Sequence, residues 1–180
     1  MKAFRKVSQG GEDLTDFDRY TAEYSPELTR FCMKLCGNVH DAEDLFQDTW
    51  ARAFERIDQY DAIYSFKKWL FAICANTFKN AKKNKYHSSK VLFSSQEEKE
   101  AFIRSIPAKE QDIDAYLDLH IAIHALPKKH RVVLILYYFR EFSQSEIAGM
   151  LGIPEGTVKS RLNTAKKLLK RRLTDEEHQR

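Results

Sequence analysis

Apolar residues recur three and four positions apart along most of the chain, which is the spacing of one face of an α-helix. Before residue 86 this pattern forms three segments, at 14–39, 39–58 and 66–85. Each segment has polar residues on its other side, so each predicts an amphipathic helix with one buried face. Only 6 Gly and 4 Pro occur among the 180 residues, and extended β-branched alternation is nearly absent, which favours helix over strand.

Short polar stretches separate these three predicted helices. Gly37 and Asn38 supply a stop for the first helix and a cap for the second, and Ser65 is placed to cap the third. Pro26 lies inside the first segment and is expected to ease that helix rather than end it. The second helix carries anions in its first turn, where the helix dipole stabilises negative charge.

Beyond residue 86 the composition changes. Residues 87–111 contain paired serines, an acidic cluster and a proline, and predict a linker. A further helix is expected from residue 113 up to Pro127. The apolar run that follows, at 128–142, fits a strand by β-propensity, but its length and the proline before it favour a buried helix.

Residues 142–162 have the features of a helix-turn-helix. Ser143 and Glu146 have the spacing of a capping box, Gly152 permits a left-handed turn, and Pro154 opens the next helix with its φ preset. The outer side of that next helix carries the kinds of side chain that contact base edges and phosphates in a major groove. These are Glu155, Thr157, Lys159, Ser160, Arg161, Asn163, Thr164 and Lys166. The alternative is a helical hairpin that only packs, which the one-sided cations disfavour.

These elements together predict an all-α protein made of two small helical domains joined by a flexible linker, the C-terminal one a helix-turn-helix. The expected boundaries are 12–86 for the first domain, 87–111 for the linker and 112–174 for the second domain.

Charge divides the chain more sharply than its net value of +4 indicates. Between Asp61 and Glu97 seven cations and no acid occur, and the same holds between Glu155 and Asp175, so the rest of the chain carries 16 cations against 26 acids. A solvated helix face normally mixes both signs, and two solvated faces are the alternative here. Two long single-sign blocks instead favour two contact sites for a polyanion such as nucleic acid.

The first basic block, most of which lies on the third predicted helix, combines its seven cations with several aromatic side chains in and around that helix. The spacing of Trp69, Ile73 and Phe78 marks some of them as core. Rings interleaved with lysines also suit single-stranded DNA, whose bases stack on the rings while its phosphates meet the ammonium groups. For the aromatics in or beside the preceding turn, base contact and simple packing remain equally weighted. These are Tyr60, Tyr64 and Phe66.

Three segments, in this order, resemble the extracytoplasmic-function sigma factors of bacterial RNA polymerase. "GNVHDAEDLFQDTWARAF" resembles the family's polymerase-binding segment, and "FKKWLFAICANTFKNAKKNK" is similar to the segment that melts and reads the minus-ten element. "LPKKHRVVLILYYFREFSQSEIAGMLGIPEGTVKSRL" is similar to the segment that reads the minus-thirty-five element. The resemblance implies an initiation factor that binds core polymerase and promoter DNA, performs no chemistry, and is controlled by an anti-sigma factor.

The same resemblance implies roles for individual residues. For polymerase binding they are Asp41, Glu43, Asp44, Leu45, Gln47 and Asp48; the acidic ones among them also suit the helix dipole. For the melted minus-ten strand they are Tyr60, Tyr64, Phe66, Lys67, Trp69, Asn76, Lys79 and Lys83, and for the minus-thirty-five duplex they are Thr157, Lys159, Ser160, Arg161, Asn163 and Thr164. The linker acids Glu97, Glu98 and Glu100 would suit a path through the polymerase's cationic RNA channel.

Three positions depart from the family pattern. Asn80 and Lys83 stand where the family often has Asp and Arg, which softens the implied contacts near the end of the third helix. Thr164 replaces a frequent Arg, which removes a phosphate or guanine donor from the recognition helix. The upstream sequence preference is therefore expected to differ.

Two other functions compete with this one. An enzyme is disfavoured because the chain has no Gly-rich phosphate loop, nucleophile elbow or zinc-protease motif. Cys32, Cys36 and His40 recur every four residues and would be a metal or redox site if they shared a helix face, but Cys is commonly buried as a small hydrophobe, so no metal or cofactor is expected. The second rival is a stand-alone operator-binding regulator, which would have no need of a single-strand platform.

The chain is expected in the cytoplasm. No apolar run approaches the roughly 20 residues of a membrane-spanning helix, and residues 1–10 lack the apolar core of a signal peptide. Its three cysteines, with Cys74 the third, are expected as reduced thiols.

Overall fold

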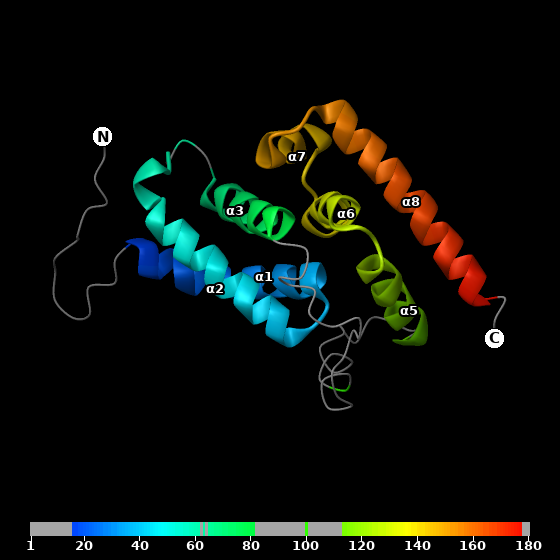
Figure 1. The fold of residues 1–180 in the computed structure, drawn as a ribbon. Helices are drawn as coiled ribbons and strands as arrows, with labels where there is room; N and C mark the ends of the chain where they lie inside the picture. The colour runs from blue at the N-terminus through cyan, green and yellow to red at the C-terminus, as the bar shows by residue number, and fades with distance from the viewer. Residues whose placement is uncertain (1–15, 62, 64, 82–99, 101–112, 178–180) are drawn as a thin grey trace.

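The computed structural model describes residues 16–61, 63, 65–81, 100 and 113–177, and within these ranges every regular element is a helix. The first unit contains α1 (Asp16–Cys36), α2 (Val39–Glu55), the short 3-10 helix η1 (Ile57–Gln59) and α3 (Phe66–Asn80). The second contains α5 (Ile113–His124), α6 (Lys128–Arg140), α7 (Gln144–Leu151) and α8 (Glu155–Glu177). Figure 1 shows the two units side by side, and the all-α prediction is confirmed.

The break between α1 and α2 lies where the sequence predicted it. Gly37 has a φ of 88°, a left-handed conformation that ends α1 without a side-chain clash against its own backbone. Asn38 is the N-cap of α2: its side chain accepts a hydrogen bond from the Asp41 amide at 2.8 Å and donates to the Asp41 carboxylate at 2.8 Å. Pro26 lies inside α1, which continues past it.

The third helix differs from its prediction at both ends. Ser65 occupies the N-cap position of α3, but its side chain makes no capping hydrogen bond. The helix ends at Asn80 because Ala81 has an extended conformation, with φ of −61° and ψ of 143°. The predicted continuation through 82–85 and the linker at 87–99 lie outside the described residues.

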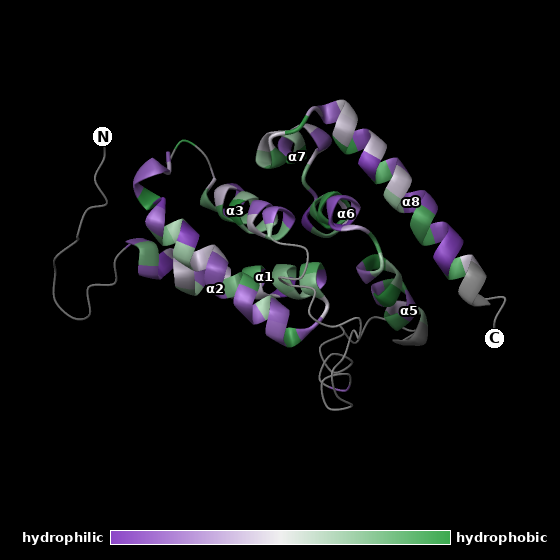
Figure 2. Ribbon diagram, viewed as in Figure 1, coloured by the Kyte–Doolittle hydropathy of each residue, from purple (hydrophilic) through white to green (hydrophobic). Residues whose placement is uncertain are grey.

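The run at 128–142 is helical up to Arg140, as its length indicated, and not a strand. In this helix, α6, seven consecutive side chains from His130 to Leu136 are buried, so the helix is enclosed on all sides. Figure 1 shows α6 almost end-on between α3 and α8, and Figure 2 shows hydrophilic residues recurring along α8 with more apolar ones between them. The predicted helix-turn-helix follows: Ser143 and Glu146 form both hydrogen bonds of a capping box, and Gly152 turns the chain with φ of 61°.

One hydrophobic core runs through both units. It includes Phe31 and Phe71 from the first unit and Leu136 and Ile147 from the second, all with no exposed surface. Arg131 joins the units by polar contacts: its buried guanidinium donates to the carbonyl of Leu35 at 2.7 Å and to that of His124 at 2.6 Å. The two predicted domains are thus packed against each other in this conformation.

Candidate nucleic-acid interface

Aromatic rings gather where α1, α2 and α3 meet. Phe66 lies at their centre, only 4% exposed, stacked on Tyr20 with ring centroids 3.9 Å apart. Tyr60 is half-buried; its ring packs edge-on against Phe66, with centroids 5.3 Å apart, and at a tilt against Trp69, with centroids 5.2 Å apart. Burial raises the pKa of the Tyr60 hydroxyl. The sequence left base contact and packing as equal alternatives for the aromatics near the turn. The structure shows packing for the buried Phe66, whereas Trp69 keeps part of its ring exposed. Tyr64 lies outside the described residues.

A cavity of about 310 Å³ opens between the end of α2 and the exposed side of α3. Trp69, Asn76 and Asn80 line it, and two arginines complete the opposite wall. The arginines are Arg52 of α2 and Arg56, the C-cap of that helix; they are four residues apart and both exposed. Sequence reasoning missed them because it assigned α2 to protein contacts; their i, i+4 spacing beside the turn was the available signal.

This cavity combines the groups that single-stranded nucleic acid requires. A guanidinium group binds a phosphate through paired hydrogen bonds, an indole ring stacks on a base, and an amide can donate to and accept from a base edge.

Three of the predicted minus-ten residues on α3 already have protein partners. Lys67 forms an ion pair with Glu27 at 2.8 Å, which lowers the pKa of that carboxyl. Asn76 donates to the carbonyl of Met150 at 2.7 Å, and Lys79 donates to that of Leu151 at 2.9 Å. Both carbonyls belong to the last turn of α7, so the amide nitrogen of Asn76 and the ammonium group of Lys79 contact the second unit. Lys83 lies outside the described residues.

The surroundings of Lys79 disfavour its charge. Burial lowers the pKa of its ammonium group, and Arg161 of α8 lowers it further by repulsion. One cation from each basic block of the sequence is therefore brought close to the other. Such a pair is stabilised by a polyanion placed between its members and is repulsive without one.

The outer face of α8 is open. Thr157 and Arg161 are half-buried, while the other predicted minus-thirty-five residues are exposed: Lys159, Ser160, Asn163 and Thr164. The opposite side of the helix packs against α5, α6 and α7 through Val158, Leu162 and Ala165, which are buried as predicted. Beyond residue 164 the exposed cations Lys167, Lys170 and Arg171 continue the open face at intervals of three and four residues. The sequence block contained them, but the predicted contact set stopped short of them.

The predicted polymerase-binding residues of α2 divide into two groups. Leu45 has no exposed surface and belongs to the core, and Asp41 is 3% exposed and bonded to Asn38, so both have structural roles. The side chains that face solvent are Glu43, Asp44 and Gln47, with Asp48 half-buried. Val39 and Phe54, exposed at the two ends of the helix, add apolar surface to this face.

The hypothesised metal or redox face is not formed as the spacing indicated. Cys32 and Cys36 are buried in α1, whereas His40 lies beyond the break, exposed on α2. Cys32 instead faces Cys74 of α3, with sulfur atoms 3.7 Å apart. Burial raises the pKa of both Cys32 and Cys36, and no cluster of metal-ligating side chains occurs among the residues that the structure describes.

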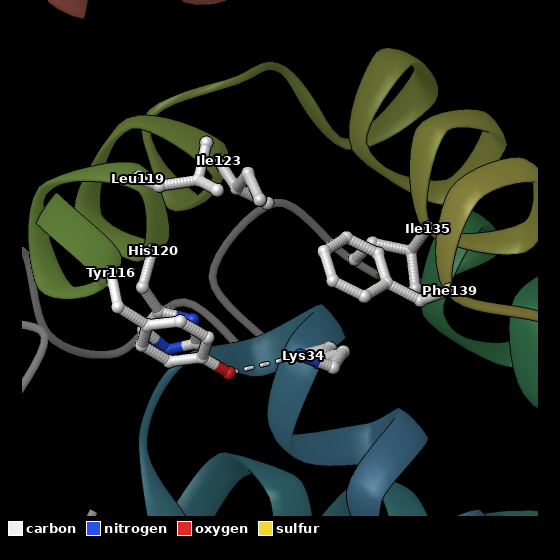
Figure 3. A pocket seen from close by; sticks show the side chains of 7 residues that line it. All are labelled: Lys34, Tyr116, Leu119, His120, Ile123, Ile135 and Phe139. Atoms are coloured by element: carbon white, nitrogen blue, oxygen red, sulfur yellow. Dashed lines mark hydrogen bonds between the residues drawn. The ribbon is translucent and has the colours of Figure 1, made fainter. Parts of the chain in front are cut away.

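A second, much smaller cavity of about 20 Å³ lies where α1, α5 and α6 meet (Figure 3). The hydroxyl of Tyr116 points toward Lys34, 3.5 Å from its ammonium nitrogen, with His120 beside it and Phe139 across the space. Burial, together with repulsion from Lys34 and Arg131, lowers the pKa of His120 to about 3. A space of this size holds about one water molecule and no organic ligand.

Comparison with known proteins relates both units to regions of sigma-70. Residues 21–87 match the family model for sigma-70 region 2, and residues 116–169 match that for sigma-70 region 4. The chain is 31% identical to the ECF RNA polymerase sigma factor SigW of Bacillus subtilis, over 97% of this chain and 96% of SigW. It is 32% identical to the ECF RNA polymerase sigma factor SigL of Mycobacterium tuberculosis H37Rv, over 82% of this chain and 83% of SigL.

Solved structures agree with these sequence comparisons. The sigma factor RpoE from Bartonella quintana, in complex with the anti-sigma factor NepR, superposes with a TM-score of 0.64 at 26% identity, over 89% of this chain and 98% of RpoE. CnrH, in complex with the cytosolic domain of CnrY, shares the fold with a TM-score of 0.60 at 22% identity, over 88% of each chain. Among the described helices none combines the length and apolarity that crossing a membrane requires.

Proposed function

The chain belongs to the extracytoplasmic-function (ECF) RNA polymerase sigma factors, and from this membership we propose how its surfaces divide the recognition of a promoter. Sigma factors of this kind are not enzymes: they bind core RNA polymerase and direct initiation at specific promoters. A stand-alone operator-binding regulator is not favoured, because the region 2 match at 21–87 adds a second recognition unit to the helix-turn-helix.

One observation supports the division most directly: the surface at α3 and the surface of α8 are built differently. The surface at α3 borders a cavity whose lining includes an indole ring, two amides and two guanidinium groups. The second block lies along a single helix, α8, whose own sequence contains no aromatic residue. A cavity with a ring suits unpaired bases, and a straight cationic helix suits a duplex groove.

We propose that the α3 surface holds the melted minus-ten strand. Trp69, Asn76 and Lys79 keep the roles expected from the sequence, and the same roles are proposed for Lys83 and Tyr64, which lie outside the described residues. Arg52 of α2 and its C-cap Arg56 join this set. Extruding a base costs a few kcal/mol of lost stacking, which a ring and hydrogen-bonding groups in one cavity would offset. Phe66 and Tyr60 pack against Trp69 and would fix the orientation of its ring.

The open face of α8 is proposed to read the minus-thirty-five duplex. Lys159 and Arg161 supply positive charge, and the uncharged donors and acceptors are Thr157, Ser160, Asn163 and Thr164. Because Thr164 stands where the family often has Arg, less of the upstream affinity would come from guanine or phosphate contacts at that point.

Polymerase binding is assigned to the exposed side of α2, through Glu43, Asp44, Gln47 and Asp48. The functional boundaries proposed are 12–86, 87–111 and 112–174, with the linker acids Glu97, Glu98 and Glu100 in the polymerase's RNA channel. The site of action would be the cytoplasm, where the polymerase works. A relative of similar fold is solved with an anti-sigma factor, which supports the proposal of such a partner here.

Transcription in vitro tests this function. Core polymerase with and without the chain would be run on a library of genomic fragments, and start sites would be mapped by sequencing the transcripts. The expected result is a set of start sites that require the chain and share an upstream and a downstream element. Absence of any chain-dependent start site would rule the proposal out.

A further inference from the structure

The cavity between the end of α2 and the exposed side of α3 lies within the first unit. None of the described residues that line it comes from α5, α6, α7 or α8. It is therefore open to a small molecule in the free chain, before any DNA strand is melted. Its volume of about 310 Å³ is at the lower end of the range of about 300 to 1,000 Å³ in which small-molecule sites fall.

Two guanidinium groups line this cavity without a counterion in the described part of the chain. Arg52 lies in the last turn of α2, and Arg56 is the C-cap of that helix. Neither side chain forms an ion pair or a hydrogen bond with a described residue, and no acidic side chain is among the described residues that line the cavity. The negative end of the α2 dipole stabilises cations at these positions without an acid. Each guanidinium can bind a phosphate through paired hydrogen bonds.

The indole ring of Trp69 lines the same cavity and is held in place by its neighbours. The ring of Phe66 packs against it with centroids 5.4 Å apart, and the ring of Tyr60 with centroids 5.2 Å apart. Trp69 is nevertheless only half-buried, so part of the ring faces solvent. A ring that is already fixed can stack on a nucleobase with little further loss of side-chain freedom.

Two amides, one helical turn apart on α3, also line the cavity. The Nδ2 of Asn76 donates to the carbonyls of Ala72 and Met150, which leaves its Oδ1 able to accept a hydrogen bond. Asn80, the last residue of α3, is exposed and has both its donor and its acceptor available. An asparagine amide pairs with N6 and N7 of adenine through two hydrogen bonds, so this lining favours a purine.

We propose that this cavity binds a free purine nucleoside di- or triphosphate. The base would stack on Trp69, Asn80 would pair with the edge of the base, and Arg52 and Arg56 would hold the phosphates. Two neighbouring cations bind a di- or triphosphate more strongly than a single DNA phosphate, because the free nucleotide concentrates more negative charge in one small ligand. Nucleotide binding here rests on the function proposed above, since a melted strand would use the same ring and guanidinium groups.

A nucleotide in the cavity and an extruded base of the strand would exclude each other. The free nucleotide would therefore lower the apparent affinity of the chain for single-stranded DNA, and the strand would lower the affinity for the nucleotide by the same factor. The face of α8 proposed to read duplex DNA shares no residue with the cavity lining. Duplex binding should therefore not respond to the nucleotide.

Tryptophan fluorescence of the full chain reports directly on this cavity. The chain has two tryptophans: Trp69 lines the cavity, whereas Trp50 is only 9% exposed and belongs to the core. ATP added to the chain without polymerase should quench the emission saturably, because its base stacks on the Trp69 indole. In Trp69→Phe, which keeps a ring but leaves Trp50 as the one fluorophore of this kind, the quenching should disappear.

The phosphate contacts are tested by Arg52→Ala with Arg56→Ala, which should weaken ATP binding by at least about tenfold. The charge-matched control is Arg19→Ala with Arg30→Ala, which removes two exposed arginines of α1 and should change the affinity by less than about twofold. Adenosine, which has no phosphate, should bind the parent chain at least about tenfold more weakly than ATP. All four arginines are exposed, and circular dichroism during heating checks that each variant is folded.

Single-stranded DNA distinguishes a free nucleotide from a nucleotide within a strand. At constant ionic strength, ATP should displace a labelled single-stranded oligonucleotide of random sequence from the chain and leave the binding of a labelled duplex unchanged. Two results would overturn nucleotide binding: Trp69 emission that does not respond to ATP, or equal quenching in the parent and in the Arg52 and Arg56 double variant. If the oligonucleotide quenches Trp69 and ATP does not, nucleotide binding is wrong while the proposed function stands; if neither ligand quenches it, both assignments of the cavity are wrong.

Discussion

Gly37 and His124 approach so closely that a β-carbon added to Gly37 would lie 2.5 Å from Nδ1 of the His124 ring. The glycine ends α1 and the histidine ends α5, so the contact joins the two helical units. The ring has little room to move, because its Nδ1 lies 3.1 Å from the guanidinium of Arg131, which is itself bonded to the carbonyl of Leu35. Position 37 thus requires glycine for two reasons: the backbone φ of 88° and the close approach of the His124 ring.

Gly37→Ala is expected to lower the free energy of unfolding by about 2 to 4 kcal/mol, from left-handed strain plus overpacking against His124. Gly152→Ala separates the two causes, since its φ is 61° but nothing lies within 4 Å of an added carbon; about 1 kcal/mol is expected there. Gly149→Ala, inside α7 with open space around it, should be neutral or stabilising by up to about 1 kcal/mol. Urea denaturation measures all three, and equal losses for Gly37 and Gly152 would contradict the steric part.

Arg131→Met should destabilise the chain by about 3 kcal/mol. The side chain has no exposed surface, and its loss leaves the carbonyls of Leu35, His124 and Leu126 without their donor. Burial lowers the pKa of this guanidinium to about 10, so it is still charged at neutral pH and suits the negative ends of α1 and α5. Denaturation by urea, followed by circular dichroism, would measure the loss; a variant as stable as the parent would show that water replaces the guanidinium at no cost.

Arg52→Ala and Arg56→Ala should each reduce promoter melting by about tenfold, the cost of one charge-assisted hydrogen bond to a phosphate or base. Both line the cavity beside Trp69, so the defect should appear in open complexes and not in the recruitment of polymerase. Permanganate reactivity of unpaired thymines measures the former and a gel shift with core polymerase the latter. Arg19→Ala, exposed on α1 away from the cavity, is the control.

These two arginines also illustrate which features the sequence did not predict. Helix identities, the Gly37 and Asn38 break and the capping box of Ser143 and Glu146 follow from local chemistry, and the sequence predicts them well. The cavity arises from two helices that approach in space, and no local pattern links Arg52 to Asn80.

Local patterns also did not predict how deeply individual side chains are buried. Leu45 and Phe66 match the segments of a known family by position, yet the structure places both in the core. Helical spacing shows that one side of a segment is buried, but the depth of a residue at the edge of that side depends on the neighbouring helix. The closed packing of α3 on α7 was not predictable either, because it depends on carbonyl groups, which every residue has.

His120 should make stability depend on pH between about 6.5 and 3. Its folded pKa is about 3, below the ordinary value, because α5 and α6 bury it and Lys34 and Arg131 repel its charged form. The unfolded chain then binds the extra proton, so this stability is complete above pH 6.5 and is lost as pH falls, by about 2 kcal/mol at pH 5. His120→Phe should reduce that slope in urea titrations, while His130, whose pKa burial also lowers, retains part of it. An unchanged slope would show that His120 is not kept neutral by the fold.

The last prediction concerns the part of α8 beyond the residues proposed to read bases. Lys167 and Arg171 continue the face of Ser160 and Thr164 at helical spacing, so on a duplex they would reach the phosphates that flank the groove. Each phosphate contact contributes about 0.9 to the slope of log affinity against log salt concentration.

Lys167→Ala with Arg171→Ala should therefore reduce that slope by about 2 in duplex binding measured by fluorescence anisotropy. The matched control, Lys166→Ala with Arg172→Ala, removes the same charge from residues beside this face. Lys166 lies over the ring of Tyr138, 5.5 Å from its centroid, rather than on the open face. If the slope falls equally for both pairs, the second basic block acts only through its overall field. If it falls for the first pair alone, α8 follows the duplex for two turns beyond Thr164.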